Sequence, residues 1–177
     1  MPFPLDVPKR IAHVDLKGVQ CRPNDILASV ERFRALGYDA LLVEYEDVFP
    51  YATGRLSMDP EEVWTRDFLA EFLAKAEFCG LEIIPLQQCL GHLEYLLRWD
   101  AFASLRLPCG FPSTLNVESR EARCLLNTML SDMIESHPRS RFVHLGMDDE
   151  KGVSSSTFTS STNWAEKWCA KKISGRV

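Results

Sequence analysis

Apolar and polar residues alternate along this chain in a way that predicts strands and helices in turn. Short apolar runs rich in β-branched residues predict strands at 11–16, 40–45 and 81–87, and a fourth strand begins at Arg141. Between these runs, apolar residues recur with helical spacing over 26–36, 68–76 and 122–134. The predicted order is therefore β-α-β-α-β-α-β. Connections of this length allow right-handed crossovers between parallel strands.

Residues at the ends of these segments sharpen the prediction. Asn24 or Asp25 can cap the first helix, Asp59-Pro60 is a typical start for the second, and Ser119 is expected to start the third. A glycine follows each of the first two helical segments, where a left-handed residue would end the helix. Pro85 lies inside the third strand and lacks a backbone donor, so a bulge or an early strand end is expected there.

This order indicates an α/β protein with a parallel sheet. The sheet is either doubly wound or the N-terminal half of a (β/α)8 TIM-type barrel. Four strands do not close such a barrel, which ordinarily needs about 250 residues. Residues 153–177 begin with a run of serine and threonine that would bury little apolar surface, so we expect an irregular, disordered tail with at most a short helix over 163–172. The predicted division is a partial barrel domain at 1–152 and this tail at 153–177.

Composition and charge exclude several classes of function. The 177 residues carry a net charge of −5, which gives no basic footprint for nucleic acid, and we expect no membrane partner because no window approaches 18 apolar residues. The N-terminal stretch has prolines and an acid where a signal peptide would be apolar, which favours a cytoplasmic or nuclear protein. The six cysteines lack paired metal spacing, and no glycine-rich phosphate loop, His-x-x-x-His pair or Gly-x-Ser-x-Gly elbow occurs, so nucleotide, zinc and serine-hydrolase functions lack support in the sequence.

Polar residues follow each predicted strand, and parallel strands bring such residues to one rim of the sheet. The residues concerned are Asp15, Glu44, Glu46, Gln87, His92, His144, Asp148 and Asp149. A single acid at a strand end is more often a helix cap or a solvated loop charge. Two adjacent acids can raise the pKa of one carboxyl and so provide a general acid, or they can cap a following helix. His144 can equally be a core histidine bonded to a backbone carbonyl.

Several segments, in series, resemble family 20 of the glycoside hydrolases. The segment His144-Leu145-Gly146-Met147-Asp148-Asp149 resembles the family signature His-x-Gly-x-Asp-Glu. Further segments resemble the family in the same order, from about Arg10 to about Gly152. They are His13 to Gly18, Glu44 to Tyr51, Ile84-Pro85-Leu86, Gly91-His92 and Thr114-Leu115-Asn116.

The resemblance implies a barrel enzyme that removes terminal N-acetylhexosamine from glycans with retention of configuration. In its substrate-assisted mechanism, the acetamido oxygen of the sugar attacks the anomeric carbon. The resemblance assigns Asp148 to orient the acetamido group and Asp149 to donate a proton to the leaving oxygen. The same resemblance places four further residues in or beside the sugar pocket, namely Asp15, Glu44, His92 and His144. No cofactor or metal is implied.

Two departures from the family pattern matter. Asp149 stands where the family has glutamate, and Glu150 follows as an alternative acid. The resemblance also stops after Gly152, before the remaining barrel strands. We therefore expect the 177-residue chain to be a truncated family member with weak or no hydrolase activity on N-acetylglucosaminides or N-acetylgalactosaminides. The alternatives are a non-catalytic half-barrel that associates with a partner, for instance as a homodimer through an open sheet edge, and a small doubly wound domain that binds a ligand at its rim.

Overall fold

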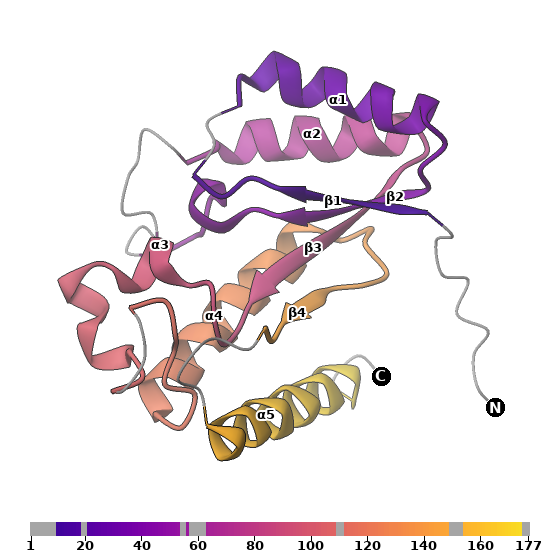
Figure 1. Ribbon diagram of the computed structural model, residues 1–177. Coiled ribbons are helices and arrows are strands. Elements are labelled where there is room, and N and C mark those ends of the chain that lie inside the picture. The colour runs from indigo at the N-terminus through magenta and orange to yellow at the C-terminus, as the bar shows by residue number, and fades with distance from the viewer. Residues whose placement is uncertain are drawn as a thin grey trace. The chain divides into compact units, whose positions relative to one another are not determined.

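The computed structural model describes residues 10–18, 21–53, 56, 63–108, 112–148 and 154–174. The strands are β1 (Ile11–Asp15), β2 (Ala40–Glu44), β3 (Glu82–Gln88) and β4 (His144–Gly146). They form one sheet in the order β1-β2-β3-β4 (Figure 1). The β1–β2 and β2–β3 pairs are parallel, so the predicted alternation of strands with helices on a parallel, open sheet is confirmed.

The helices occupy the connections between the strands, except α5, which follows β4. They are α1 (Pro23–Ala35), α2 (Arg66–Phe78), α3 (Glu94–Leu97), α4 (Arg120–Ser136) and α5 (Ser155–Ser174), with 3-10 helices η1 (Glu46–Val48) and η2 (Asp100–Leu105). The described residues divide into two compact units. The first unit comprises residues within 1–86 and 134–144, and the second comprises residues within 87–133 and 145–177.

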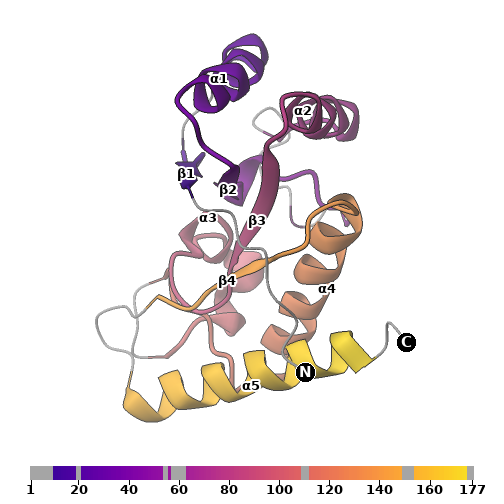
Figure 2. The ribbon, with the colours of Figure 1, turned by 90° about the vertical axis from the view of Figure 1, so that its right-hand side faces the viewer.

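The first unit contains β1, β2 and most of β3, with α1 and α2 side by side on one side of β1 and β2 (Figures 1 and 2). Helix α1 buries Ile26 and Val30, one turn apart, and α2 buries Leu69, Phe72 and Ala76. This spacing of three and four residues places the apolar side chains on one helical face. The predicted amphipathic helices are thus confirmed as the cover of the sheet.

The helix starts differ from the sequence prediction. Arg22 rather than Asn24 or Asp25 is the first boundary residue of α1; it makes no side-chain cap, and Pro23 occupies the first turn. Proline suits that position because its fixed backbone angle is helical and its missing donor would have no helical partner. The start predicted at Asp59-Pro60 lies outside the described residues. Helix α2 begins at Arg66, where the Thr65 hydroxyl accepts a hydrogen bond from the Phe68 amide at 3.0 Å.

Strands β3 and β4 also differ in length from the prediction. Pro85 does not end β3, which continues to Gln88, and Pro85 is in register with Val43 of β2. The expected bulge or early end is therefore wrong at this position. Strand β4 covers only His144–Gly146, although a strand beginning at Arg141 was expected. Arg141 instead makes an ion pair with Glu82 at 2.7 Å, which fixes the approach to β4 within the first unit.

A buried polar contact joins distant parts of the first unit. The hydroxyl of Tyr45, which follows β2, lies 2.9 Å from Nε2 of His137, 92 residues further along the chain. Both residues are buried, and the Tyr45 ring also makes edge contacts with Phe49 and Trp64. Burial raises the pKa of the Tyr45 phenol well above its usual value of 10.0, because the interior disfavours the phenolate.

Alkaline conditions should therefore destabilise this unit in a way that depends on Tyr45. Above pH 10 the unfolded chain ionises this tyrosine while the folded chain keeps it neutral, so unfolding releases a proton and stability falls as pH rises. The limiting contribution is about 1.4 kcal/mol per pH unit. Urea titrations between pH 7 and pH 11 should show a shallower loss for Tyr45→Phe than for the wild type. An unchanged slope in Tyr45→Phe would contradict the buried, neutral phenol.

The second unit contains α3, η2, most of α4 and α5. The Arg106 guanidinium donates hydrogen bonds to the carbonyl oxygens of Leu97, Arg98 and Trp99, in the segment where α3 ends and η2 begins. Helix α4 starts as predicted, with the Ser119 hydroxyl accepting from the Ala122 amide at 3.1 Å. Its buried face consists of Ala122, Leu126, Met129, Leu130 and Met133.

Helix α5 corrects the prediction of a disordered tail. It covers Ser155–Ser174, and buried Thr157, Ser161, Ala165 and Trp168 recur along one face. The Ser154 hydroxyl accepts from the Thr157 amide at 3.1 Å, and the Ser161 hydroxyl donates to the Thr157 carbonyl at 2.9 Å. The expectation failed because small hydroxyl side chains that bond to the helix backbone can be buried at little cost.

Candidate functional site

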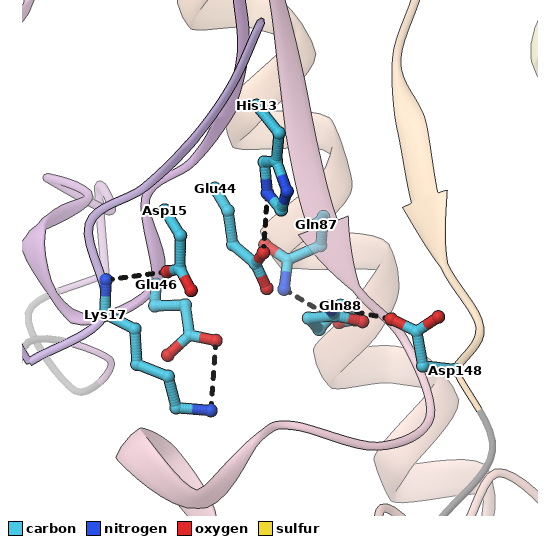
Figure 3. A network of polar contacts seen from close by, with 8 residues as sticks. All are labelled: His13, Asp15, Lys17, Glu44, Glu46, Gln87, Gln88 and Asp148. Carbon is cyan, nitrogen blue, oxygen red and sulfur yellow. Dashed lines mark hydrogen bonds and ion pairs between the residues drawn. The ribbon is translucent and has the colours of Figure 1, made fainter.

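Three residues of the first unit bring polar groups to the carboxyl ends of β1 and β2. Asp15 is in register with Glu44 on the neighbouring parallel strand, so the two side chains leave the same face of the sheet. Glu44 is buried, and its Oε2 lies 3.0 Å from Nε2 of the exposed His13. Asp15 is exposed, and its carboxylate accepts from the Lys17 amide at 2.9 Å (Figure 3).

An ion pair follows directly after these strands. The Lys17 ammonium lies 3.5 Å from Oε1 of Glu46, whose side chain is buried. Glu46 has a positive φ of 49°, an uncommon conformation for a non-glycine residue that costs energy. The edge of the first unit therefore presents two acid–base pairs, His13–Glu44 and Lys17–Glu46, beside the Asp15 carboxylate. Carboxylates of this kind can accept hydrogen bonds from ligand hydroxyl groups.

In the second unit, two adjacent glutamines end β3 near Asp148, the second residue after β4. Gln87 and Gln88 are both buried. The Gln88 side-chain amide donates to Oδ2 of Asp148 at 3.3 Å, and the Gln87 amide donates to the Gln88 carbonyl at 2.9 Å (Figure 3). Asp148 itself is exposed, so its carboxylate is held by a buried amide and remains accessible to a ligand.

Gly146, two residues before Asp148, makes this arrangement sterically feasible. A Cβ atom at this position would lie 2.0 Å from Oε1 and 3.1 Å from Cα of Gln88. The Gly146 carbonyl accepts from the Cys89 amide at 2.7 Å, so the backbones of the two segments are directly paired. The glycine is required here because the Gln88 side chain crosses the space that a Cβ would fill.

The remaining predicted site residues have different outcomes. His92, in the second unit, is half-buried in the loop after β3 and has a positive φ of 57°. His144, in the first unit, is exposed, which rules out the alternative of a core histidine, while its predicted place in the sugar pocket stays a prediction. Asp149 and Glu150 lie outside the described residues. Within each unit, the structure thus confirms that polar residues gather at strand ends, while the roles of these residues stay predictions.

Sequence reasoning missed Gln88 and the steric role of Gly146. A signal for Gln88 existed, because two adjacent glutamines at the end of a buried strand must point to opposite faces, and each needs a partner. The partner itself lies 60 residues away, and no local pattern identifies it. Lys17 was noted only as part of a matching segment, and its pairing with Glu46 depends equally on tertiary structure.

The described residues hold no group of three or more histidine, cysteine, aspartate or glutamate side chains arranged to bind a metal ion. No described helix combines the length and apolar character needed to cross a membrane.

Comparison with known sequences identifies two similar proteins, although no family model matches the chain. Hexosaminidase D from Bos taurus is 36% identical over 140 residues, which cover 79% of this chain and 40% of the relative. Hexosaminidase D from Homo sapiens is 37% identical over 140 residues, which cover 79% of this chain and 29% of that protein. The chain therefore spans at most about two-fifths of these curated relatives.

Comparison with solved structures confirms the predicted fold. The family 20 β-N-acetylhexosaminidase from Streptomyces coelicolor A3(2) matches with a TM-score of 0.75 and 19% identity, over 93% of this chain and 38% of that structure. A mutant Streptomyces plicatus β-hexosaminidase matches with a TM-score of 0.77 and 16% identity, over the same shares. The chain has the fold of part of these barrels. Because 93% of the chain exceeds the 152 residues before the expected tail, the structural match extends into α5.

Proposed function

We propose that this chain, which is hexosaminidase D-like in sequence and shares part of the fold of family 20 glycoside hydrolases, belongs to a β-N-acetylhexosaminidase-type hydrolase. The proposed substrates are glycans or glycoconjugates with a terminal N-acetylhexosamine. The observation that carries this proposal is the position of Asp148. Asp148 is the second residue after β4, and its exposed carboxylate accepts a hydrogen bond from the buried side-chain amide of Gln88.

The proposed reaction is substrate-assisted and retains the anomeric configuration. The acetamido oxygen of the sugar attacks the anomeric carbon and forms an oxazolinium ion, while the glycosidic carbon–oxygen bond breaks. Asp148 accepts a hydrogen bond from the acetamido N–H and stabilises the positive charge that develops. Asp149, or Glu150 in its place, gives a proton to the leaving oxygen. Water then attacks the anomeric carbon and gives a proton back to the acid that protonated the leaving group. This attack opens the oxazolinium ring and restores the acetamido group.

The polar groups of the first unit fit a role in sugar binding. Glu44 and Asp15 provide carboxylate acceptors for sugar hydroxyl groups, and the His13 contact fixes one Glu44 oxygen. On the basis of the resemblance, we also assign roles in sugar binding to His92 and His144. Homodimer formation and a cytoplasmic or nuclear location stay predictions, to be tested by analytical ultracentrifugation and by imaging of a fluorescent fusion.

The central prediction concerns Asp148. The isolated 177-residue chain should hydrolyse chromogenic N-acetyl-β-glucosaminide or galactosaminide weakly or not at all, because it spans at most about two-fifths of the hexosaminidase D relatives. It should still bind N-acetylglucosamine in preference to glucose, which lacks the acetamido group. Asp148→Asn should remove this preference and reduce any turnover about 100-fold, as expected when one charge-stabilising group is lost.

The matched control is Asp67→Asn, an exposed acid in the first turn of α2. This variant should keep the wild-type preference, measured by isothermal titration or NMR titration. A wild-type chain that binds both sugars equally would contradict the proposed substrate class. Turnover at the level of a complete hexosaminidase would contradict the predicted weak activity, and an unchanged preference in Asp148→Asn would contradict the role of Asp148.

A further inference from the structure

We infer that Gln88 is the positioning residue for Asp148, and that Gly146 is glycine so that the Gln88 amide can reach this carboxylate. The inference rests on the proposed function for its catalytic meaning, but the contact itself is a property of the second unit. Gln88 lies at the end of β3, outside the motif that contains Asp148, and the inference gives it a role in that site.

The geometry limits what Gln88 can do. Its side chain is buried, with 4% of the residue exposed, and its amide nitrogen lies 3.3 Å from Oδ2 of Asp148. The amide carries two donor hydrogens and no charge, so it can hold a carboxylate without neutralising it. A lysine or arginine at this position would instead hold the carboxylate through an ion pair. Gln88 therefore orients Asp148 and leaves its negative charge available to a developing cation.

The backbone around Gln88 is fixed on both sides. The Gln87 side chain donates to the Gln88 carbonyl, and the next residue, Cys89, donates its amide to the Gly146 carbonyl. These two contacts hold the start of the Gln88 side chain in place relative to β4. A rotation of its amide away from Asp148 would leave a buried polar group to find another partner, which is costly.

Gly146 completes the arrangement. Since a Cβ at this position would lie 2.0 Å from Oε1 and 2.5 Å from Cδ of Gln88, an alanine would force the amide out of its place. The glycine of the His-x-Gly-x-Asp sequence thus leaves space for the Gln88 side chain from the preceding strand. Gly146, Gln88 and Asp148 therefore form one arrangement.

The first test needs no enzymatic activity. In the 1H–15N NMR spectrum, the Gln88 side-chain amide signals can be assigned by their loss in Gln88→Leu. In Asp148→Ala these signals should shift, and their hydrogen exchange should accelerate about tenfold, the factor that corresponds to a typical hydrogen bond. The Asp67→Ala control should leave them unchanged. Identical Gln88 signals in the wild type and Asp148→Ala would overturn the contact.

The second test separates positioning from a structural role. Gln88→Leu keeps similar volume but has no donor, and it should reduce the preference for N-acetylglucosamine over glucose about tenfold, because the hydrogen bond that orients the Asp148 carboxylate is lost. A purely structural role would lower the midpoint of unfolding and leave the sugar preference intact, and this result would overturn the inference. A wild-type chain without any preference would count against the proposed function, while the NMR test would still decide the contact.

The third test concerns the glycine. Gly146→Ala should lower the midpoint of thermal unfolding and remove the sugar preference. Adding Gln88→Ala to this variant should restore much of the midpoint, because the overlapping side chain is gone, without restoring the preference. If the loss of stability in the double variant equalled the sum of the losses in Gly146→Ala and Gln88→Ala, the two substitutions would be additive. The two residues would then not be coupled, and the steric argument would be wrong.

Discussion

An Asp149→Glu variant should hydrolyse a chromogenic N-acetylhexosaminide about 100-fold faster than the wild-type chain. Asp149 occupies the position that the family signature gives to glutamate. The shorter side chain withdraws the acidic group by roughly one carbon–carbon bond, about 1.5 Å. A displacement of about 1 Å from the productive geometry costs on the order of 100-fold in rate, because proton transfer requires close contact with the leaving oxygen. Restoring the missing methylene should recover this factor.

The neighbouring acid provides the control for this experiment. Glu150→Gln should leave the rate of the Asp149→Glu variant unchanged if position 149 supplies the proton. If Glu150→Gln abolished the activity of the wild-type chain, and Asp149→Glu gave no increase, Glu150 would be the acid and Asp149 would have another role. Initial rates should be measured across a range of pH, so that a change in the protonation of the acid is not mistaken for a change in its position.

A Phe49→Ala variant should destabilise the first unit by about 3–5 kcal/mol, the range found when a buried phenylalanine is truncated. Phe49 follows η1 and is fully buried. Its ring lies 4.7 Å from the ring of Tyr51 and 5.5 Å from that of Tyr45, and it stacks on His137 at 6.2 Å. Removal of the ring leaves a cavity in this cluster and withdraws a packing surface from the Tyr45–His137 contact.

Phe78 offers the same substitution in a different environment. It is the last residue of α2 and is 87% exposed, so Phe78→Ala should change the free energy of unfolding by less than about 0.5 kcal/mol. Both variants can be compared by urea denaturation at pH 7 with circular dichroism. Equal losses of stability in the two variants would show that the aromatic cluster does not support the unit as described.

The order of strands and helices was predictable because it depends on local periodicity. The run from Ala40 to Val43 is apolar throughout and short, which favours a buried strand, and helical spacing in 122–134 marks one face of a helix. The gathering of polar residues at strand ends followed from the parallel topology. Pro85 was misjudged because a proline can stay in a strand, here paired with Val43, where the neighbouring contacts outweigh its missing donor.

The tail shows where composition misleads. A run of serine and threonine was expected to lack stable structure, yet α5 buries Thr157 and Ser161 on the face that also contains Trp168. Helix formation there depends on hydroxyl groups that bond to the backbone and on a surface to pack against. The hydroxyl–backbone bonds could have been considered from the sequence, whereas the packing surface exists only in the folded chain.

The sequence by itself determined the alternating order of elements, the strand ends at which acids occur, and the resemblance carried by the segments around Asp15, Glu44 and Asp148. Only the tertiary structure decided that Gln88 holds Asp148 and that Gly146 must lack a side chain. The physical reason is the range of the interactions involved. Periodicity and caps act over a few residues, while a hydrogen bond across 60 residues depends on how two strands are placed side by side.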